Sequence, residues 1–227
     1  GSVYDYVWGG SAGLRYTTSA GAYYALPTSG GSGGAIKVMA STSSYDMGWD
    51  SSMTYGFNTP LIMTSPYDTG TGQVVNPFTT LIQGLIDNDS TLSIATAASR
   101  VSTAFGLTSY YDSLGITSDS ELLYFNPLDY TSSSATKTAA IAMQAQAIQI
   151  VATISAGTQA VLAQNSNMDE VSVTKALLSS LVSYVDSNYA DGVDLSSATV
   201  IDSVLSSVTA DNSSGTSTTV YLTDQAL

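Results

Sequence analysis

The chain has 227 residues, of which 44% are hydrophobic, 10% are charged and none is Cys or His, and its net charge is −13. This length and this hydrophobic fraction allow a sizeable core in one large domain or two small ones. Five basic residues against 18 acidic ones argue against binding to nucleic acid or to an anionic membrane surface, because both need clustered Lys and Arg. The absence of Cys and His excludes disulfides, Ser-His-Asp and Cys-His catalysis, and nearly all transition-metal sites.

The first 75 residues alternate between short strands and glycine turns. Turns such as 29–34 separate runs of β-forming residues, and these runs are 3–8, 14–18, 22–26, 35–40, 53–57 and 61–64. Short strands at regular spacing are typical of antiparallel β-sandwiches. We therefore predict an N-terminal antiparallel β-sandwich-like domain over residues 1–75, rich in Tyr and Gly.

From Asn76 onwards the pattern indicates helices. Asn76 is a suitable N-cap, Pro77 fits the first helical position, and apolar residues follow at helical spacing over 78–86. Further helices are predicted at 90–105, 118–125, 135–165, 169–189 and 196–208. The helix over 135–165 is the longest, and Gly157 is the place where we expect it to bend or split. Together these helices predict an α-helical bundle domain over residues 76–210.

Residues 211–227 are predicted to be a linker followed by a C-terminal strand at 218–223, which completes an α+β fold class. A strand must pair with something, because its backbone groups otherwise stay exposed. It either folds back onto its own sheet or adds to the sheet of a neighbouring copy, as in donor-strand complementation. The strand at 3–8 has the same two options. The candidate assembly residues are Val3, Tyr4, Tyr6, Val7, Thr219, Val220, Tyr221 and Leu222.

The acidic composition permits divalent cations, and calcium is the candidate, although the sequence requires no cofactor. Calcium binds six to eight oxygen atoms, usually including several carboxylates that lie close together. Asp46, Asp50 and Asp68 are the candidate ligands, although the Gly-rich loop around Asp68 also suits an ordinary turn. Plain solubility is the alternative explanation of the acidic excess.

The sequence predicts no enzyme. Its acidic residues show no spacing that marks an acid/base pair for glycoside hydrolysis. Ser134 and Lys137 match the Ser-x-x-Lys spacing of one class of hydrolases, but they lie in a Ser/Thr-rich helix start and no companion motif is present. Capping explains these two residues better than catalysis does.

Three spaced motifs of this chain have a familiar order. They are Asp68-Thr-Gly-Thr-Gly with Val75-Asn-Pro-Phe-Thr-Thr-Leu-Ile82, then Phe125-Asn-Pro-Leu128, then Gly192-Val-Asp-Leu-Ser-Ser-Ala-Thr-Val200. The set resembles a module of very large secreted or surface-attached bacterial proteins, the calcium-binding adhesin-like proteins, and it touches residues 65–208. The resemblance implies a small β-domain docked on a helical bundle, a location outside the cell or at its surface, and no catalysis. That module commonly has an acidic calcium loop in its first hairpin, whereas residues 8–15 here contain no carboxylate.

The low-charge surface favours permanent assembly. Immobilising a Lys or Arg side chain costs about 1.5–2 kcal/mol, and Ser or Thr costs much less, although a secreted monomer can have the same composition. We predict a non-enzymatic extracellular structural protein, a subunit or module of a bacterial surface filament, surface layer or adhesive assembly, that forms homo-oligomers or polymers through strand exchange. The alternative is a surface adhesin whose Tyr-lined β-domain recognises glycans or another cell.

The sequence gives two expectations about targeting. No apolar run reaches the 18 residues of a membrane span, so we expect none. No signal peptide precedes the first strand, so we expect either a processed mature protein or a cloned segment that begins with the cloning residues Gly1 and Ser2.

Overall fold

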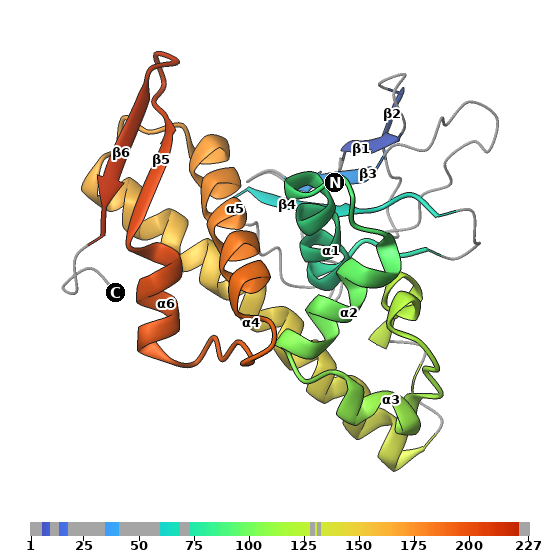
Figure 1. Ribbon diagram of the computed structural model, residues 1–227. Coiled ribbons are helices and arrows are strands. Elements are labelled where there is room, and N and C mark those ends of the chain that lie inside the picture. Colours follow the sequence, from blue (N-terminus) through green and yellow to red (C-terminus); the bar gives the residue numbers. More distant parts are fainter. Residues whose placement is uncertain are drawn as a thin grey trace, which may run out of the picture.

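The structure is a computed structural model that describes residues 6–9, 14–17, 35–40, 60–68, 73–127, 130 and 133–222. This described part is mostly helical (Figure 1). Its strands are β1 (Tyr6–Gly9), β2 (Leu14–Thr17), β3 (Ile36–Ala40), β4 (Leu61–Ser65), β5 (Ser207–Asp211) and β6 (Ser217–Tyr221). Its helices are α1 (Pro77–Asn88), α2 (Ile94–Ala104), α3 (Thr108–Leu114), the 3₁₀ helix η1 (Asp119–Tyr124), α4 (Ser134–Gln164), α5 (Glu170–Asn188) and α6 (Ala198–Leu205).

The predicted β-sandwich is wrong. The described N-terminal strands form one four-stranded sheet in the order β2-β1-β3-β4, in which all neighbours are antiparallel. No second sheet faces it within the described residues, and α1 packs against its edge strand β4 instead. Short strands separated by glycine turns fit either arrangement, because the pattern describes one sheet and does not reveal what covers it. The predicted strands at 22–26 and 53–57 lie outside the described residues.

Helix α1 begins where the sequence predicts. Asn76 Oδ1 accepts a hydrogen bond from the Thr79 backbone N–H at 2.9 Å, and Thr79 Oγ1 accepts one from the Asn76 N–H at 2.9 Å, which together form a capping box. The same first turn is bonded to β4, because Thr79 Oγ1 lies 2.9 Å from the Thr64 carbonyl and the Thr64 N–H donates to Thr80 Oγ1 at 3.0 Å. Hydrogen bonds therefore cross the predicted boundary between residues 75 and 76, and the three-part division of the chain stays a prediction.

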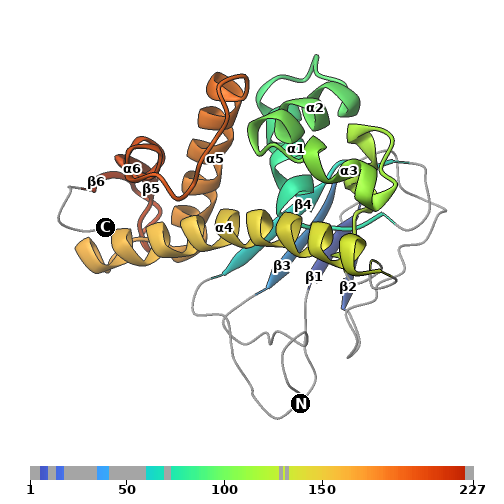
Figure 2. The ribbon, with the colours of Figure 1, turned by 90° about the horizontal axis from the view of Figure 1, so that it is seen from below.

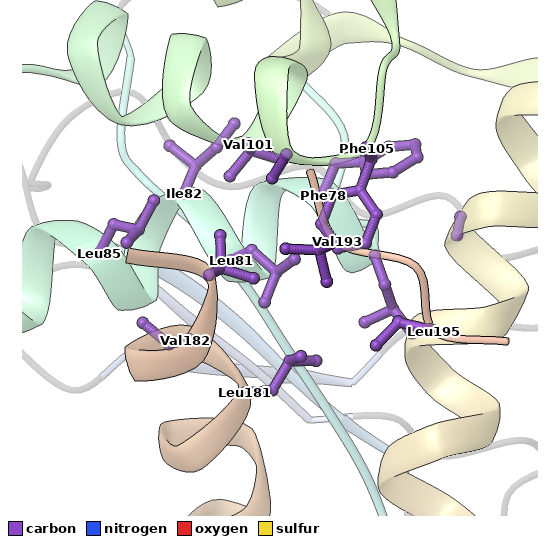
Figure 3. Close-up of a cluster of buried hydrophobic side chains, with 14 of the residues drawn as sticks. Phe78, Leu81, Ile82, Leu85, Val101, Phe105, Leu181, Val182, Val193 and Leu195 are labelled. Carbon is purple, nitrogen blue, oxygen red and sulfur yellow. The ribbon is translucent and has the colours of Figure 1, made fainter. Parts of the chain in front are cut away.

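The core lies between α1, α2 and α5 (Figure 3). The apolar stripe of α1 packs with side chains from the other two helices and from the segment before α6. The centre of this core consists of Phe78, Leu81, Ile82, Leu85, Val101, Phe105, Leu181, Val182, Val193 and Leu195. All ten are buried. The helical spacing predicted for α1, α2 and α5 is thereby confirmed at these positions.

Helix α4 is a single helix of 31 residues that passes through Gly157 without a break. Figures 1 and 2 show that it runs across the molecule from the side of α3 to the β5–β6 hairpin. A Cβ atom added at Gly157 would lie 2.7 Å from Leu205 Cδ2 and 3.1 Å from Leu177 Cδ1. The expected bend or split is wrong, and the glycine instead permits close packing of α4 against α5 and α6.

The C-terminal strand pairs within its own chain. β5 and β6 form an antiparallel hairpin, whose turn is held by Asn212 Oδ1 accepting from the N–H groups of Ser214 and Thr216 at 3.0 Å and 2.9 Å. Gly215 has a φ of 79°, which favours glycine in this turn. The last helix, predicted over 196–208, ends at Leu205. The residues predicted to be the end of this helix and the start of the linker form β5 instead.

Candidate assembly site

The β5–β6 hairpin has two distinct faces. Val208, Ala210, Val220 and Leu222 are buried, whereas the alternate residues of β6, among them Thr219 and Tyr221, are exposed. This alternation is the strand period of two with one face on the core. The outward face is uncharged along β6, and Tyr221 is 69% exposed there.

The register of the hairpin fixes which backbone groups of β6 point outward. The Leu222 N–H donates to the Ser206 carbonyl at 3.1 Å, and the Asn212 N–H donates to the Thr216 carbonyl at 2.9 Å. Hydrogen-bonded pairs alternate with non-bonded pairs in an antiparallel ladder, so the even-numbered residues of β6 bond to β5. The N–H and C=O groups of Ser217, Thr219 and Tyr221 therefore lie along the outer edge.

The two outer edges of this hairpin differ. At the outer edge of β5, the Asp211 N–H donates to Ser172 Oγ at 2.9 Å and the Asp211 carbonyl accepts from the Asp169 N–H at 2.8 Å, so the start of α5 covers this end. No strand of the described residues pairs with the outer edge of β6. Both ribbon views place β6 at the periphery of the molecule (Figures 1 and 2).

The candidate residues of the N-terminal strand have a different setting. Tyr6 and Val7 lie on β1, which pairs with β2 on one side and with β3 on the other. An inner strand has no free edge, so β1 as it stands in this sheet offers no place for a strand from another copy. Val3 and Tyr4 lie outside the described residues.

Asp68 belongs to a hydrogen-bonded loop after β4. Its Oδ2 accepts from the Tyr124 hydroxyl at 2.6 Å, and its N–H donates to Gln73 Oε1 at 3.2 Å. Gln73 Nε2 in turn donates to Ser65 Oγ at 2.8 Å. These bonds connect the loop to η1 and to the end of β4.

Calcium at Asp46, Asp50 and Asp68 stays a prediction. Asp46 and Asp50 lie outside the described residues, and within the described ones no group of three or more acidic side chains is placed to hold a metal ion. A thermal melt in excess calcium and in EDTA tests the site. Equal melting temperatures in both solutions would show that calcium does not stabilise the fold.

The perturbed carboxylates of the described region stabilise turns. Hydrogen bonds from the Thr91, Thr117 and Ser196 hydroxyls lower the pKa of Asp89, Glu121 and Asp194, respectively. Each of the three acids accepts from a backbone N–H of the same threonine or serine as well. The Asp194 bonds form an Asx turn, and a structural role accounts for all three shifts.

A second surface feature lies on α4. Ile141 and Ile148 are 59% and 57% exposed, and they are seven residues apart on one side of the helix. The sequence pattern assigned neither residue to a surface. Only Lys137 is charged in the whole helix, and such a helix, apolar or small on most sides, gives a weak signal of which face is buried.

Helix α4 also meets the length and composition of a membrane span, alone among the helices of the described residues. One third of its most apolar window is buried inside the fold, where Met143, Ala147 and Ile150 lie in the core. A core helix meets the same two criteria, so the expectation of no membrane span stays a prediction.

Comparisons of the chain with protein-family models, with curated proteins and with solved structures found no match. The resemblance to the adhesin-like module therefore stands on the three motifs alone.

Proposed function

We propose that the protein is a non-enzymatic structural subunit of an extracellular bacterial assembly, such as a filament, surface layer or adhesive layer, whose copies join along β6. The open edge of β6 is the observation that carries this proposal. Within the described residues no strand pairs with its outward backbone groups at Ser217, Thr219 and Tyr221. A strand of a neighbouring copy can therefore bond to them, and main-chain pairing is how β-augmentation obtains its affinity.

The partner strand that fits best is β6 of a second copy. Two antiparallel β6 strands present the same edge to each other, which is the self-complementary arrangement of a two-fold contact. The residues of β6 carry no charge, so two such edges approach without bringing like charges face to face. Thr219 at the middle of the strand would lie near the two-fold axis.

Thr219→Pro tests the edge without breaking the hairpin. The Thr219 N–H points away from β5, so proline removes a donor that only an added strand would use. We expect Thr219→Pro to abolish association through β6, measured by sedimentation velocity over a range of concentrations and by electron microscopy.

Thr219→Val is the matched control. It loses the same side-chain contact, the Thr209 Oγ1 to Thr219 Oγ1 bond of 2.7 Å, but it keeps the backbone N–H. We expect it to associate like the original chain. If Thr219→Pro and Thr219→Val assemble equally well, β6 is not the joining edge.

The glycan-binding alternative remains a prediction without a structural argument. The Tyr side chains on which it depends, in residues 1–59, lie where the structure describes no side-chain surroundings apart from 35–39. A sugar array probed with the Thr219→Pro variant, which lacks the β6 contact, tests it.

A further inference from the structure

The exposed side of α4 is an uncharged stripe that runs along most of the helix. It consists of exposed apolar, small or amide side chains at intervals of three or four residues, beginning after Lys137, and these are Ile141, Gln144, Ala145, Ile148, Ala152, Ala156, Gln159 and Ala163. We call this set the α4 stripe. Ile141 and Ile148 stand seven residues apart, and a seven-residue spacing keeps apolar side chains on one seam between two packed helices.

The charge of the molecule points to a second copy as the occupant of the stripe. The net charge is −13, so two copies repel each other over most orientations. From residue 138 to residue 164 the helix contains no carboxylate and no other charge. Two copies that meet along the α4 stripe therefore place no acidic side chains of this helix against each other.

Lys137 sets the direction of the pairing. It lies in the first turns of α4, at the end of the helix that carries a partial positive charge, where a cation is unfavourable. Within the described residues Lys137 forms no ion pair. The C-terminal end of α4 has no basic residue in its last turn to offset its partial negative charge, and Asp169 and Glu170 follow it. In an antiparallel pair, Lys137 of each helix lies next to the partial negative charge at the C-terminal end of the other helix, so both unfavourable charges are offset.

We propose that the α4 stripe is a second contact between copies, in which two α4 helices pack antiparallel and Lys137 of each lies beside the C-terminal end of the other. The two-fold axis then falls near residue 150, midway between Lys137 and Ala163. This inference rests on the proposed assembly role and extends it. A β6 contact alone closes at a dimer, whereas two different two-fold contacts on one subunit alternate and extend the assembly beyond a dimer, into an open polymer where the two axes do not intersect.

Single cysteines test the direction of packing, because the chain contains no Cys of its own. In the antiparallel pair the two copies of residue 152 are offset by about 6 Å along the helices, and the two copies of residue 138 by about 36 Å, at 1.5 Å per residue. With a short bismaleimide, we expect Ala152→Cys to form a covalent dimer and Thr138→Cys to stay monomeric on a denaturing gel. Cross-linking of both to equal extents would show parallel packing and overturn the proposal.

Charge substitutions test the contact itself. Ile148 is exposed, so Ile148→Glu and Ile148→Lys are expected to keep the melting temperature of the original chain. Each variant alone places like charges close to the two-fold axis and is expected to lose the α4 dimer. An equimolar mixture of the two is expected to restore dimers, since opposite charges then face each other. Ala95→Glu, on the exposed side of α2, is the matched control and should change nothing.

The β6 contact is removed independently, so the two ideas fail separately. In the Thr219→Pro background, α4 dimers are expected to persist. If Ile148→Glu still yields β6 dimers and the same polymers, the α4 proposal fails and the proposed function stands. If Thr219→Pro polymers are normal, the β6 edge fails and the α4 contact stands.

Two other occupants are outcomes of the same test. Flotation of the original chain with phosphatidylcholine vesicles, lost in Ile148→Glu, would identify a lipid surface. A monomeric Ala152→Cys variant whose new thiol resists alkylation would show that another part of the same chain covers the stripe. Either result overturns the proposal.

Discussion

At the residue scale, Tyr111 is the centre of a buried polar network. Its hydroxyl donates to Asp119 Oδ1 at 3.0 Å and lies 2.9 Å from Ser102 Oγ. A phenol has one hydrogen, so Ser102 must be the donor in the second bond. Burial raises the pKa of Tyr111 well above its usual value, which keeps the phenol neutral and this arrangement intact across the ordinary pH range.

We expect Tyr111→Phe to destabilise the fold by about 1–3 kcal/mol, because the fully buried Ser102 hydroxyl loses its acceptor. Urea unfolding measures the change. Tyr110→Phe, at a partly buried neighbour, is the control, and the double variant Ser102→Ala/Tyr111→Phe should recover part of the loss. A Tyr111→Phe variant as stable as the original chain would show that Ser102 has another acceptor.

Asp194 predicts a specific pH dependence. The Ser196 hydroxyl and N–H donate to Asp194 Oδ1 at 2.6 Å and 2.9 Å, and the first of these bonds makes the larger contribution to lowering the pKa of Asp194 in the folded chain. Because the folded pKa lies below the unfolded value of about 3.9, the ionised carboxylate stabilises the fold above about pH 4. This contribution is lost as the pH falls through the folded pKa.

Asp194→Asn keeps an oxygen acceptor but does not titrate. We expect the original chain to melt at a higher temperature than Asp194→Asn at about pH 6–7, and the difference to shrink as the pH falls below about 4 and through the folded pKa of Asp194. Differential scanning calorimetry across this range measures it, with the exposed Asp112→Asn as control. A difference that stays constant with pH would mean that charge at Asp194 contributes nothing.

At the element scale, the crossing of α1 and α5 depends on Gly84. A Cβ atom there would lie 2.5 Å from Val182 Cγ2 and 3.2 Å from Val182 Cγ1. Val182 is buried and β-branched, so its rotamer is almost fixed in a helix. Replacing Gly84 by Ala gains up to about 1 kcal/mol of helix propensity, but overpacking costs typically about 1–3 kcal/mol.

We therefore expect Gly84→Ala to lower the free energy of unfolding by roughly 1–2 kcal/mol. Val182→Ala removes the crowding methyl groups, so the double variant should be less destabilised than the sum of the two single variants. Chemical denaturation of the four chains gives the coupling. Strict additivity would show that α1 and α5 move apart freely at this crossing.

Local signals predicted the elements better than their partners. The start of α1 depends on Asn76 and Thr79, which are three residues apart, and the sequence alone predicted its N-cap and its first residues. The β-sandwich prediction failed because it required knowledge of what covers the sheet, and a helix covers it at β4. β5 was missed because Val200, Val204 and Val208 continue the helical spacing of α6 into it. The alternation of Val208 and Ala210 with polar neighbours and the following Asn-Ser-Ser-Gly turn nevertheless signal a hairpin.

At the scale of the whole molecule, the candidate contacts were only partly visible in the sequence. The strand at Thr219–Leu222 was predicted from its β-forming residues. Which edge of the hairpin is covered depends on the packing of α5 against β5, and no local sequence pattern encodes that packing. The contact surface of α4 was even harder to predict from the sequence, because Ile150 is buried whereas Ile148, two residues away, is exposed. Only the packing of α4 against α1, α3 and α5 distinguishes the two positions.

Apart from Lys137, the side chains named in both proposed contacts are uncharged, while the molecule around them carries a net charge of −13. Long-range repulsion should therefore oppose assembly, and short-range packing and backbone pairing should drive it. Salt screens the long-range repulsion, because the Debye length falls from about 10 Å at 0.1 M to about 3 Å at 1 M. It does not screen the short-range packing and backbone pairing. We expect light scattering and sedimentation to show faster and more extensive assembly as NaCl is raised.

The double variant Thr219→Pro/Ile148→Glu distinguishes assembly from salting-out. It lacks both contacts but differs by only one charge, so its scattering should stay low over the same salt range. Assembly that weakens with added salt would mean that ion pairs hold the copies together, and Lys137 would then be the first residue to replace. Because Lys137 is the only charged residue of helix α4, Lys137→Gln should abolish such a salt effect while leaving the β6 contact unchanged.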